Sequence, residues 1–582
     1  MHATGSSIAR ASDLQKFFYK TLHSIWRAGG SRQRLGLAIS GGVDSMALAS
    51  LCRDAATSQD EKPLFRGFIV DHGLRQGSAD EAQNVAESLR KLDIKPSVLT
   101  LDWTRYGSPE SLSNLESIAR RLRYQALGQA CRREGITSLL VAHHADDQAE
   151  TVLLRLLGQF HGNGLRGITS SRPMPECEGL YGVSQSGEPW TIDRTHVGNH
   201  NVTSASAMLV EGGGVKLERP LLPVSKDELI AYCNHDGVRW FEDHTNSDRS
   251  YTRRNTIRHL LGSESLPRAL QKPRLQALAA TIAGREATAE RLAQTMFDDT
   301  GIQLDLRSGQ AIVTLPLECR PAASAKLSAS ALDAKARFAR KLLLPVSPCA
   351  QINLQDLDHL LSLLFAQETN LSSSRDGRYQ IAGVDLIRTT TPSLHGQFKL
   401  QRSTPTTRER DTVQQQLFAE TVELTANTNL NTSKSDWHLW DNRYWIRVSG
   451  PFASSYQDIR VRFLQPQDLA RLRSQLSKTD RKRLDRLLEI VPGDFRFTLP
   501  VLVARGIGVE EEVQHVVTLP TLGWSAEGWA RWSSTTGFRA QAGVAACFHW
   551  DVRYRHIDLT VSRKKVVSKC ETTAGDASER SY

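Results

Sequence analysis

The sequence predicts an α/β protein whose N-terminal part is a parallel sheet with helices on both faces. Short apolar runs recur along this part, segments of helical composition separate them, and a glycine-rich turn follows the first run. The runs are Leu35–Ile39, Phe65–Val70, Ser97–Leu101 and Ser138–Ala142, and the helical segments include Ser78–Lys91 and Leu112–Glu134. Such alternation is typical of parallel sheets, which place their sites beyond the carboxyl ends of the strands.

Length and composition indicate a globular protein of several domains. The 582 residues correspond to three or four domains. Apolar residues make up 40% and charged residues 23% of the chain. No apolar run approaches the roughly 18 residues of a membrane span, so we expect no membrane partner. The net charge of +10 is compatible with a polyanionic partner.

The cysteines and the N-terminus give indications of where in the cell the protein works. The eight cysteines are scattered and form no C-x-x-C pair, which predicts reduced thiols in an intracellular protein and no zinc site. Residues 1–28 hold four basic residues and one acidic residue. Residues 1–11 are therefore a candidate mitochondrial targeting segment, and a cytoplasmic location is the alternative. Residues 12–28 carry the apolar spacing of a helix.

Composition shifts predict the domain organisation. A helical and mixed region and then a mixed α+β region follow the sheet domain, and two segments rich in polar residues interrupt the chain. We expect an N-terminal helix at 1–32, a sheet domain at 33–260 with a flexible insertion at about 174–215, a helical or mixed domain at 261–402, a flexible linker at 403–435, a C-terminal domain at 436–569 and a disordered tail at 570–582.

The glycine-rich turn predicts a phosphate site. It follows the first strand, opens a helix, and consists of Ser40, Gly41, Gly42, Val43, Asp44 and Ser45. Two glycines let the backbone approach a ligand closely, and a helix N-terminus favours phosphate. A carboxylate beside phosphates needs a cation between them, so Asp44 predicts Mg²⁺. No lysine of a Walker loop is present.

A second motif follows the fourth strand. If a helix begins near Ala145, then His144, Asp147, Gln148 and Thr151 share one of its faces. Imidazoles and carboxylates placed there can hold Mg²⁺ or deprotonate an amine. The alternative is a capped, solvated helix start.

These motifs resemble one family. Ser-Gly-Gly-Val-Asp-Ser resembles the PP-loop of N-type ATP pyrophosphatases, with an adenine nucleotide alpha hydrolase-like fold. Further matching motifs are Asp71 to Arg75, Arg120 to Tyr124, Ala142 to Thr151, Arg219 to Leu222, Glu242 to Asn246 and Arg253 to Arg258. Their order is similar to that of the tRNA(Ile)-lysidine synthases over about residues 33–260.

The resemblance implies a ligase that forms a carbon–nitrogen bond. ATP would adenylate the C2 oxygen of wobble cytidine 34 in a tRNA(Ile) with a CAU anticodon, and free lysine would displace AMP to give lysidine. The implied cofactors are ATP, as substrate, and Mg²⁺. The resemblance makes 33–260 the PP-loop catalytic domain and implies that the C-terminal domain at 436–569 binds tRNA. Relatives also imply a homodimer.

The resemblance also assigns residues to roles. The expected catalytic residues are Asp44, His143, His144, Asp147 and Arg219. The expected ATP-binding residues are Ser40 to Ser45, Asp71 and His72, with Asp44 as the magnesium ligand. The expected tRNA- or lysine-binding residues are Arg75, Arg123, Tyr124, Gln148, Glu150, Thr151, Asn246, Arg253, Arg254, Asn255 and Arg258.

Three other functions fit part of the pattern. A PP-loop tRNA thiolase shares the loop, but generally needs cysteine pairs. A GMP-synthetase-like ligase shares the loop and leaves His143 to Thr151 unexplained. A non-catalytic tRNA-binding homologue would retain the motifs without turnover. The arginines of 120–123 and the basic run at 471–486 can equally be solvated helix faces.

Overall fold

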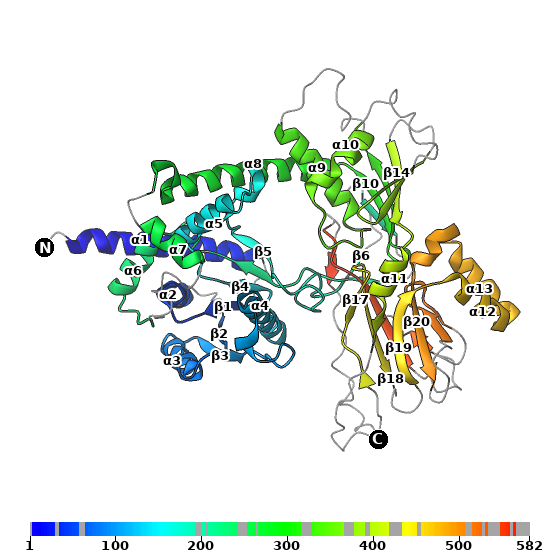
Figure 1. The fold of residues 1–582 in the computed structure, drawn as a ribbon, viewed down its shortest axis with the longest axis horizontal. Helices are drawn as coiled ribbons and strands as arrows, with labels where there is room; N and C mark the ends of the chain where they lie inside the picture. The colour runs from blue at the N-terminus through cyan, green and yellow to red at the C-terminus, as the bar shows by residue number, and fades with distance from the viewer. Residues whose placement is uncertain are drawn as a thin grey trace, which may run out of the picture. The chain divides into compact units, whose positions relative to one another are not determined.

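The computed structural model describes most of the chain and separates it into two compact units (Figure 1). The first unit is residues 1–187 and 213–288, and the second is residues 188–212 and 289–582. The described residues are 3–28, 34–57, 64–192, 200–203, 208–241, 253–262, 266–315, 329–365, 378–389, 396–417, 433–450, 456–506, 515–525, 530–532, 548–558 and 563–565.

The first unit is built on a six-stranded sheet of order β3-β2-β1-β4-β9-β5. Neighbouring strands are parallel except for β5, which runs antiparallel to β9. The strands are β1 (Leu35–Ile39), β2 (Phe65–Asp71), β3 (Lys95–Thr100), β4 (Ser138–Leu140), β5 (Ser171–Pro173) and β9 (Lys216–Glu218). The predicted parallel sheet is confirmed, and the four expected strands lie within a few residues of their predicted bounds.

Helices cover both faces of this sheet because its strands alternate apolar side chains. Ile69 packs with the helices α1, α2, α3 and α6, whereas its neighbour Phe68 packs with α4. A further cluster joins α5, α7 and α8. The helices are α1 (Ala3–Ala28), α2 (Val43–Thr57), α3 (Ser78–Lys91), α4 (Leu115–Arg133), α5 (Ala145–Leu157), α6 (Lys226–His235), α7 (Arg253–Gly262) and α8 (Lys272–Asp298), with short 3₁₀ turns at Pro109–Ser111, Gly162–Leu165 and Arg268–Leu270.

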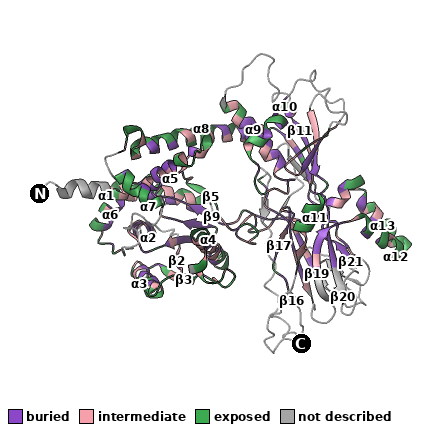
Figure 2. Ribbon diagram, viewed as in Figure 1, coloured by how far each residue is buried: buried purple, intermediate pink, exposed green. Residues whose placement is uncertain are grey.

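The predicted N-terminal helix is present and is longer than expected. Helix α1 begins at Ala3, so most of the candidate targeting segment is helical. Its residues Phe18, Leu22 and Trp26 are buried against α2 and α6. Figure 2 shows how the helices of the chain carry both buried and exposed residues. No helix among the described residues is long and apolar enough to cross a membrane.

The second unit contains three sheets and a large apolar core. Their orders are β12-β13-β14-β11-β10-β7, β15-β19-β20-β21-β22 and β16-β18-β24-β8-β6-β25, with β17 beside β18 and β23 beside β24. The strands are β6 (Trp190–Ile192), β7 (His200–Thr203), β8 (Leu209–Val210), β10 (Gly301–Asp305), β11 (Gln310–Leu315), β12 (Arg378–Ile381), β13 (Val384–Arg388), β14 (Gly396–Arg402), β15 (Gln415–Gln416), β16 (Ser433–Lys434), β17 (His438–Trp440), β18 (Tyr444–Gly450), β19 (Tyr456–Phe463), β20 (Pro500–Gly506), β21 (His515–Leu519), β22 (Trp524–Ser525), β23 (Ala530–Trp532), β24 (Phe548–Tyr554) and β25 (Arg563–Lys565).

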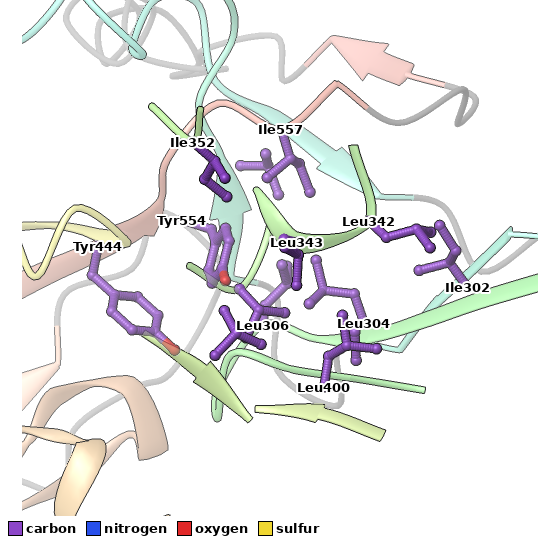
Figure 3. Close-up of a cluster of buried hydrophobic side chains, with 14 of the residues drawn as sticks. Ile302, Leu304, Leu306, Leu342, Leu343, Ile352, Leu400, Tyr444, Tyr554 and Ile557 are labelled. Atoms are coloured by element: carbon purple, nitrogen blue, oxygen red, sulfur yellow. The ribbon is translucent and has the colours of Figure 1, made fainter. Parts of the chain in front are cut away.

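Helices pack against these sheets around two clusters. The larger cluster includes Leu304, Leu343, Tyr444 and Tyr554, which point toward a shared interior in Figure 3. The smaller cluster lies under α12 and α13. The helices are α9 (Ala329–Leu343), α10 (Asp358–Leu364), α11 (Thr407–Val413), α12 (Pro466–Gln475) and α13 (Lys478–Leu488), with 3₁₀ turns at Leu354–Leu357, Gly493–Thr498 and Pro520–Leu522.

The insertion predicted at 174–215 differs from the expectation. Its described parts combine irregular turns with short strands: Met174 and Cys177 lie among turns and are buried in the first unit, whereas β6, β7 and β8 join sheets of the second unit. These strands are two to four residues long, so they show no alternation of apolar residues from which the sequence could predict them. Their partners, such as β10 and β24, lie far away in the chain.

The predicted linker at 403–435 also contains regular structure where it is described. Thr406 and Glu409 form a reciprocal capping box that begins α11, and Leu417 is buried in the core. Residues 418–432, and the whole predicted tail at 570–582, lie outside the described residues. The first unit extends to Thr288 and so continues past the predicted boundary at 260.

Candidate nucleotide and base-modification site

The glycine-rich turn lies at the carboxyl end of β1, as the strand–turn–helix pattern predicts. Gly41 has a φ of +89°, and a Cβ there would lie 2.6 Å from Val85 Cγ2, so this position requires glycine. The Ser45 hydroxyl donates to Gly42 O at 2.9 Å and accepts from the Ser40 backbone N–H at 3.3 Å. Hydrogen bonds of Ser45 therefore stabilise the turn, and α2 begins within it at Val43.

Asp44 is the carboxylate of this turn, and one of its oxygens has no partner. Its Oδ1 is buried and meets no hydrogen-bond partner among the described residues. Its Oδ2 lies 3.5 Å from His144 Nε2 and 4.0 Å from Lys226 Nζ. An unsatisfied carboxylate oxygen at a phosphate-type turn is a suitable ligand for a hard divalent cation. The described residues contain no cluster of three or more histidine, cysteine or acidic side chains that could hold a metal by themselves.

His144 connects Asp44 to the start of α5. Its Nδ1 accepts from the Asp146 N–H at 3.2 Å, and its N–H donates to Asp147 Oδ2 at 3.0 Å, which completes a capping box. Burial works to lower the pKa of His144, but the carboxylates of Asp44 and Asp147 raise it above its usual value. In the neutral form Nδ1 accepts, so Nε2 carries the proton and faces the two carboxylates.

His143 lies beside Arg219, which crosses from the loop after β9. Arg219 Nε donates to His143 Nδ1 at 3.2 Å, and Arg219 Nη1 donates to Thr169 O at 2.8 Å. Burial lowers the pKa of His143 to about 4, against the opposing charge of Asp147. His143 is therefore neutral near pH 7, and its Nε2–H is a hydrogen-bond donor. The contacts of Arg219 give it a positioning role toward His143.

Asp147 and Glu150 form a charge network with two arginines of α7. Arg254 donates to Asp147 Oδ1 at 2.6 Å and to Glu150 Oε2 at 2.8 Å, and Arg258 Nε donates to Glu150 Oε1 at 2.7 Å. Both carboxylates are buried, whereas the Arg254 and Arg258 side chains are 43% and 38% exposed. These arginines therefore form ion pairs within the chain, and their contact with tRNA or lysine stays a prediction.

The same network lowers the basicity of Asp147. Burial alone would raise the pKa of Asp147, but His144 and Arg254 hold it below its usual range. Its Oδ2 already accepts from the His144 N–H, and its Oδ1 accepts from Arg254. Because a carboxylate with a lowered pKa is a weak base, Asp147 is better suited to attract a cation than to remove a proton.

Two residues expected to bind tRNA or lysine have contacts within the chain, and their predicted roles stay predictions. The Gln148 side chain donates to Ile168 O at 2.8 Å and accepts from the Ile168 N–H at 2.6 Å. Tyr124 is a buried residue of α4, and the guanidinium carbons of Arg120 and Arg123 lie 4.9 and 5.2 Å from its ring centroid. Gln148 lies on the predicted face of α5, and its side chain binds the backbone of the loop at Ile168.

The other predicted residues lie at neighbouring strand and helix ends. Asp71 is buried at the end of β2 and accepts from the Gly73 N–H at 3.0 Å. Burial lowers the pKa of His72, and the charge of Arg123 acts in the same direction. Arg75 is exposed and donates to Glu81 Oε2 at 2.6 Å. Thr151 is half-buried on α5.

The remaining predicted residues are Asn246, Arg253 and Asn255. Asn255 lies on α7 between the two arginines of the charge network. Asn246 and the side chain of Arg253 lie outside the described residues.

Sequence reasoning missed two lysines that meet carboxylates of the site. Lys226 begins α6 and lies near Asp44, and Lys272 begins α8 and contacts Asp146 at 2.5 Å. The available signal for Lys226 was its place four residues after Leu222, in the loop that leaves a strand of the parallel sheet. Lys272 carries no such signal, because it starts a long helix of ordinary composition.

Comparison with known proteins identifies the class of the first unit. A PP-loop domain family matches residues 11–265, the region that contains the glycine-rich turn and the histidine–carboxylate group. The chain thus contains a PP-loop domain, an ATP-using class.

One relative that matches over most of both chains identifies the family. A protein of Schizosaccharomyces pombe named as a probable tRNA(Ile)-lysidine synthase is 30% identical over 512 residues, covering 88% of this chain and 95% of that protein. The chain belongs to the tRNA(Ile)-lysidine synthase family.

Bacterial relatives match a smaller share of the chain. The tRNA(Ile)-lysidine synthase of Bradyrhizobium diazoefficiens is 33% identical over 50% of this chain and 71% of that protein. That of Enterococcus faecalis is 32% identical over 40% of this chain and 41% of that protein. Among solved structures, the U34-tRNA thiolase NcsA of Methanococcus maripaludis aligns with 47% of this chain at 13% identity and a TM-score of 0.34, covering 80% of that chain.

Proposed function

We propose that this chain joins lysine to the wobble cytidine of a tRNA(Ile) with a CAU anticodon, using ATP and Mg²⁺. The observation that carries the proposal is Asp44, a carboxylate in a glycine turn beside the histidine pair after β4, with one oxygen that has no partner among the described residues. Family membership supports the substrates, because the relatives are tRNA(Ile)-lysidine synthases.

The proposed reaction has two steps. The C2 oxygen of the cytidine attacks the α-phosphorus of ATP, and pyrophosphate leaves with the electron pair of the broken P–O bond. The ε-amine of lysine then attacks C2, the C2–O bond breaks, AMP leaves with the oxygen, and the amine loses a proton. Lysine has an ordinary pKa of about 10.4, so it arrives protonated.

Each residue of the site has its own proposed role in these steps. Asp44 would hold Mg²⁺, which neutralises phosphate charge when bound. The neutral His143 offers its Nε2–H to a ligand, and Arg219 keeps it in that tautomer. Asp147, whose pKa is lowered, would attract the lysine ammonium by charge, together with the buried side chain of Glu150. The proton of the amine then goes to solvent or to a group of higher pKa than Asp147.

A thiolase activity has less support in the chain's thiols. Cys52, Cys131, Cys177 and Cys233 are buried. Burial raises the pKa of the Cys177 and Cys233 thiols to about 12, so they are poor nucleophiles near neutral pH. Cys319, Cys547 and Cys570 lie outside the described residues.

The test is transfer of radiolabelled lysine to an unmodified tRNA(Ile) transcript with a CAU anticodon, in the presence of ATP and Mg²⁺. We expect label on the wobble cytidine, mapped by nuclease digestion and mass spectrometry, and a loss of at least about 10³-fold in Asp44→Ala. AMP release without label would keep the adenylating chemistry and overturn lysine as the second substrate. Neither product would indicate a binding protein without turnover.

We also propose a mitochondrial location and a homodimer for this enzyme. The basic start of the chain supports the first, although Phe18, Leu22 and Trp26 make residues 11–28 part of the folded unit. Imaging of the full chain against a variant without residues 1–10 tests the location, and equal distribution of both would contradict it. Light scattering of the purified chain tests the dimer, and a mass of one chain would contradict it.

A further inference from the structure

Helix α6 brings a lysine to the phosphate turn that the turn itself lacks. The residues Ser40 to Ser45 contain no cationic side chain, although a nucleotide triphosphate carries several negative charges. Lys226 is the first residue of α6, and its Nζ lies 4.0 Å from Asp44 Oδ2. Its side chain is 44% exposed, so it can reach a ligand in solution.

The position of Lys226 is fixed by contacts on both sides. The Tyr232 hydroxyl lies 2.8 Å from Asp54 Oδ2 and 3.1 Å from Ser50 Oγ, which fastens α6 to α2. Ser225 and Glu228 form a capping box at the start of α6. The Ala145 N–H donates to Val224 O at 2.8 Å and ties the preceding loop to α5. The backbone at Lys226 is therefore held against both α2 and α5.

The other described cations near the turn already have close partners. Arg219 donates to His143 and Thr169, Arg254 and Arg258 donate to Asp147 and Glu150, and Lys272 contacts Asp146. The pair between Lys226 and Asp44 is longer and half-exposed. Such a pair stabilises a fold only weakly, so it exchanges easily for a phosphate.

We propose that Lys226 is a further catalytic residue of the adenylation step. Its ammonium leaves Asp44 when ATP binds, contacts the β- and γ-phosphates, and stabilises the charge that develops on pyrophosphate as the bond to the α-phosphorus breaks. No proton is transferred. This assignment rests on the proposed function and gives the chain, from α6, the phosphate-binding lysine that other nucleotide loops carry within the loop.

The experiment compares nucleotide affinities in three variants with Mg²⁺ present. Lys226→Met and Lys226→Arg are set against Lys91→Met, which removes an exposed lysine at the last turn of α3. The ligands are AMP, which lacks the β- and γ-phosphates, and an α,β-methylene analogue of ATP, which is not cleaved. Calorimetry measures both affinities, and pyrophosphate release with the tRNA transcript measures the step itself.

We expect Lys226→Met to bind the ATP analogue about 10- to 100-fold more weakly, the loss of one charge-assisted contact, with AMP affinity unchanged. Pyrophosphate release falls at least as much, Lys226→Arg recovers most of it, and Lys91→Met behaves as the native chain.

Equal losses for AMP and the ATP analogue, or no loss for either, would overturn the assignment. A native chain that binds ATP and transfers no lysine would contradict the proposed function, while the comparison of the two nucleotides would still decide the role of Lys226.

Discussion

The network between α5 and α7 and the network around Asp441 both pair arginines with carboxylates, but they differ in how far the arginines are exposed to solvent. In the first, Arg254 and Arg258 are 43% and 38% exposed beside two buried carboxylates. In the second, Arg402, Asp441 and Arg443 are each at most 1% exposed. The first lies at the site end of a parallel sheet, and its arginines are open to solvent. The second is sealed within the core of the second unit and can only support the fold.

The geometry of the sealed network explains this difference. Arg443 Nε donates to Asp441 Oδ2 at 2.8 Å, and Arg443 Nη2 donates to Thr498 O at 2.7 Å. Arg402 reaches Asp441 and Glu409. A buried charge is tolerated only when it is paired and hydrogen-bonded. An arginine–carboxylate pair is thus informative about function only when its exposure and place in the fold are known.

The largest effect on stability is expected from Asp441→Ala. This change leaves two buried guanidinium groups without their shared carboxylate, and we expect the second unit to lose about 3–5 kcal/mol of unfolding free energy. Denaturant unfolding followed by the fluorescence of buried Trp440 and Trp445 measures it. Asp436→Ala removes an exposed aspartate nearby and should cost less than about 0.5 kcal/mol. Similar losses in both variants would show that the network is not what holds this region.

An intermediate effect is expected from His143→Gln, and it depends on pH. Burial lowers the pKa of folded His143 to about 4, whereas the unfolded side chain takes up a proton near 6.5. The unfolded state therefore binds more protons between these values, and acidification destabilises the first unit. From pH 7 to pH 5 the loss is about 2 kcal/mol.

Thermal unfolding at both pH values tests this sign. His143→Gln should lose less stability on acidification than the native chain, because glutamine does not titrate. His72, whose pKa is also lowered by burial, remains in both proteins and leaves a common residual dependence. An identical acid sensitivity in the two proteins would contradict a neutral, buried His143.

The smallest effect is expected from Arg258→Gln, and it sharpens the contrast with Asp441. Arg254 still pairs with Glu150 after this change, and the lost side chain is partly exposed, so we expect a loss of about 1 kcal/mol or less. We expect the salt dependence of tRNA binding to be unchanged, because the guanidinium is paired within the chain. A weaker salt dependence would show that Arg258 reaches a phosphate when tRNA binds.

The sequence determined the chemistry-bearing turn, its parallel sheet and the start of α5, because these follow from local signals. Glycines at a strand end, apolar runs of five or six residues and a histidine cap are readable without knowing what packs on them. Asp44, His143 and His144 were therefore predicted by residue, and the structure places them at the ends of neighbouring strands.

Only the tertiary structure decided which partners these residues have. Asp147 and Arg254 are 107 positions apart, and Asp44 and Lys226 meet through the packing of α6 on α2. The strands β6, β7 and β8 are too short for a period, and each depends on a partner distant in the sequence. Local propensity fixes an element, but long-range pairing fixes its charge environment, and therefore whether a carboxylate binds a metal, a substrate or an arginine.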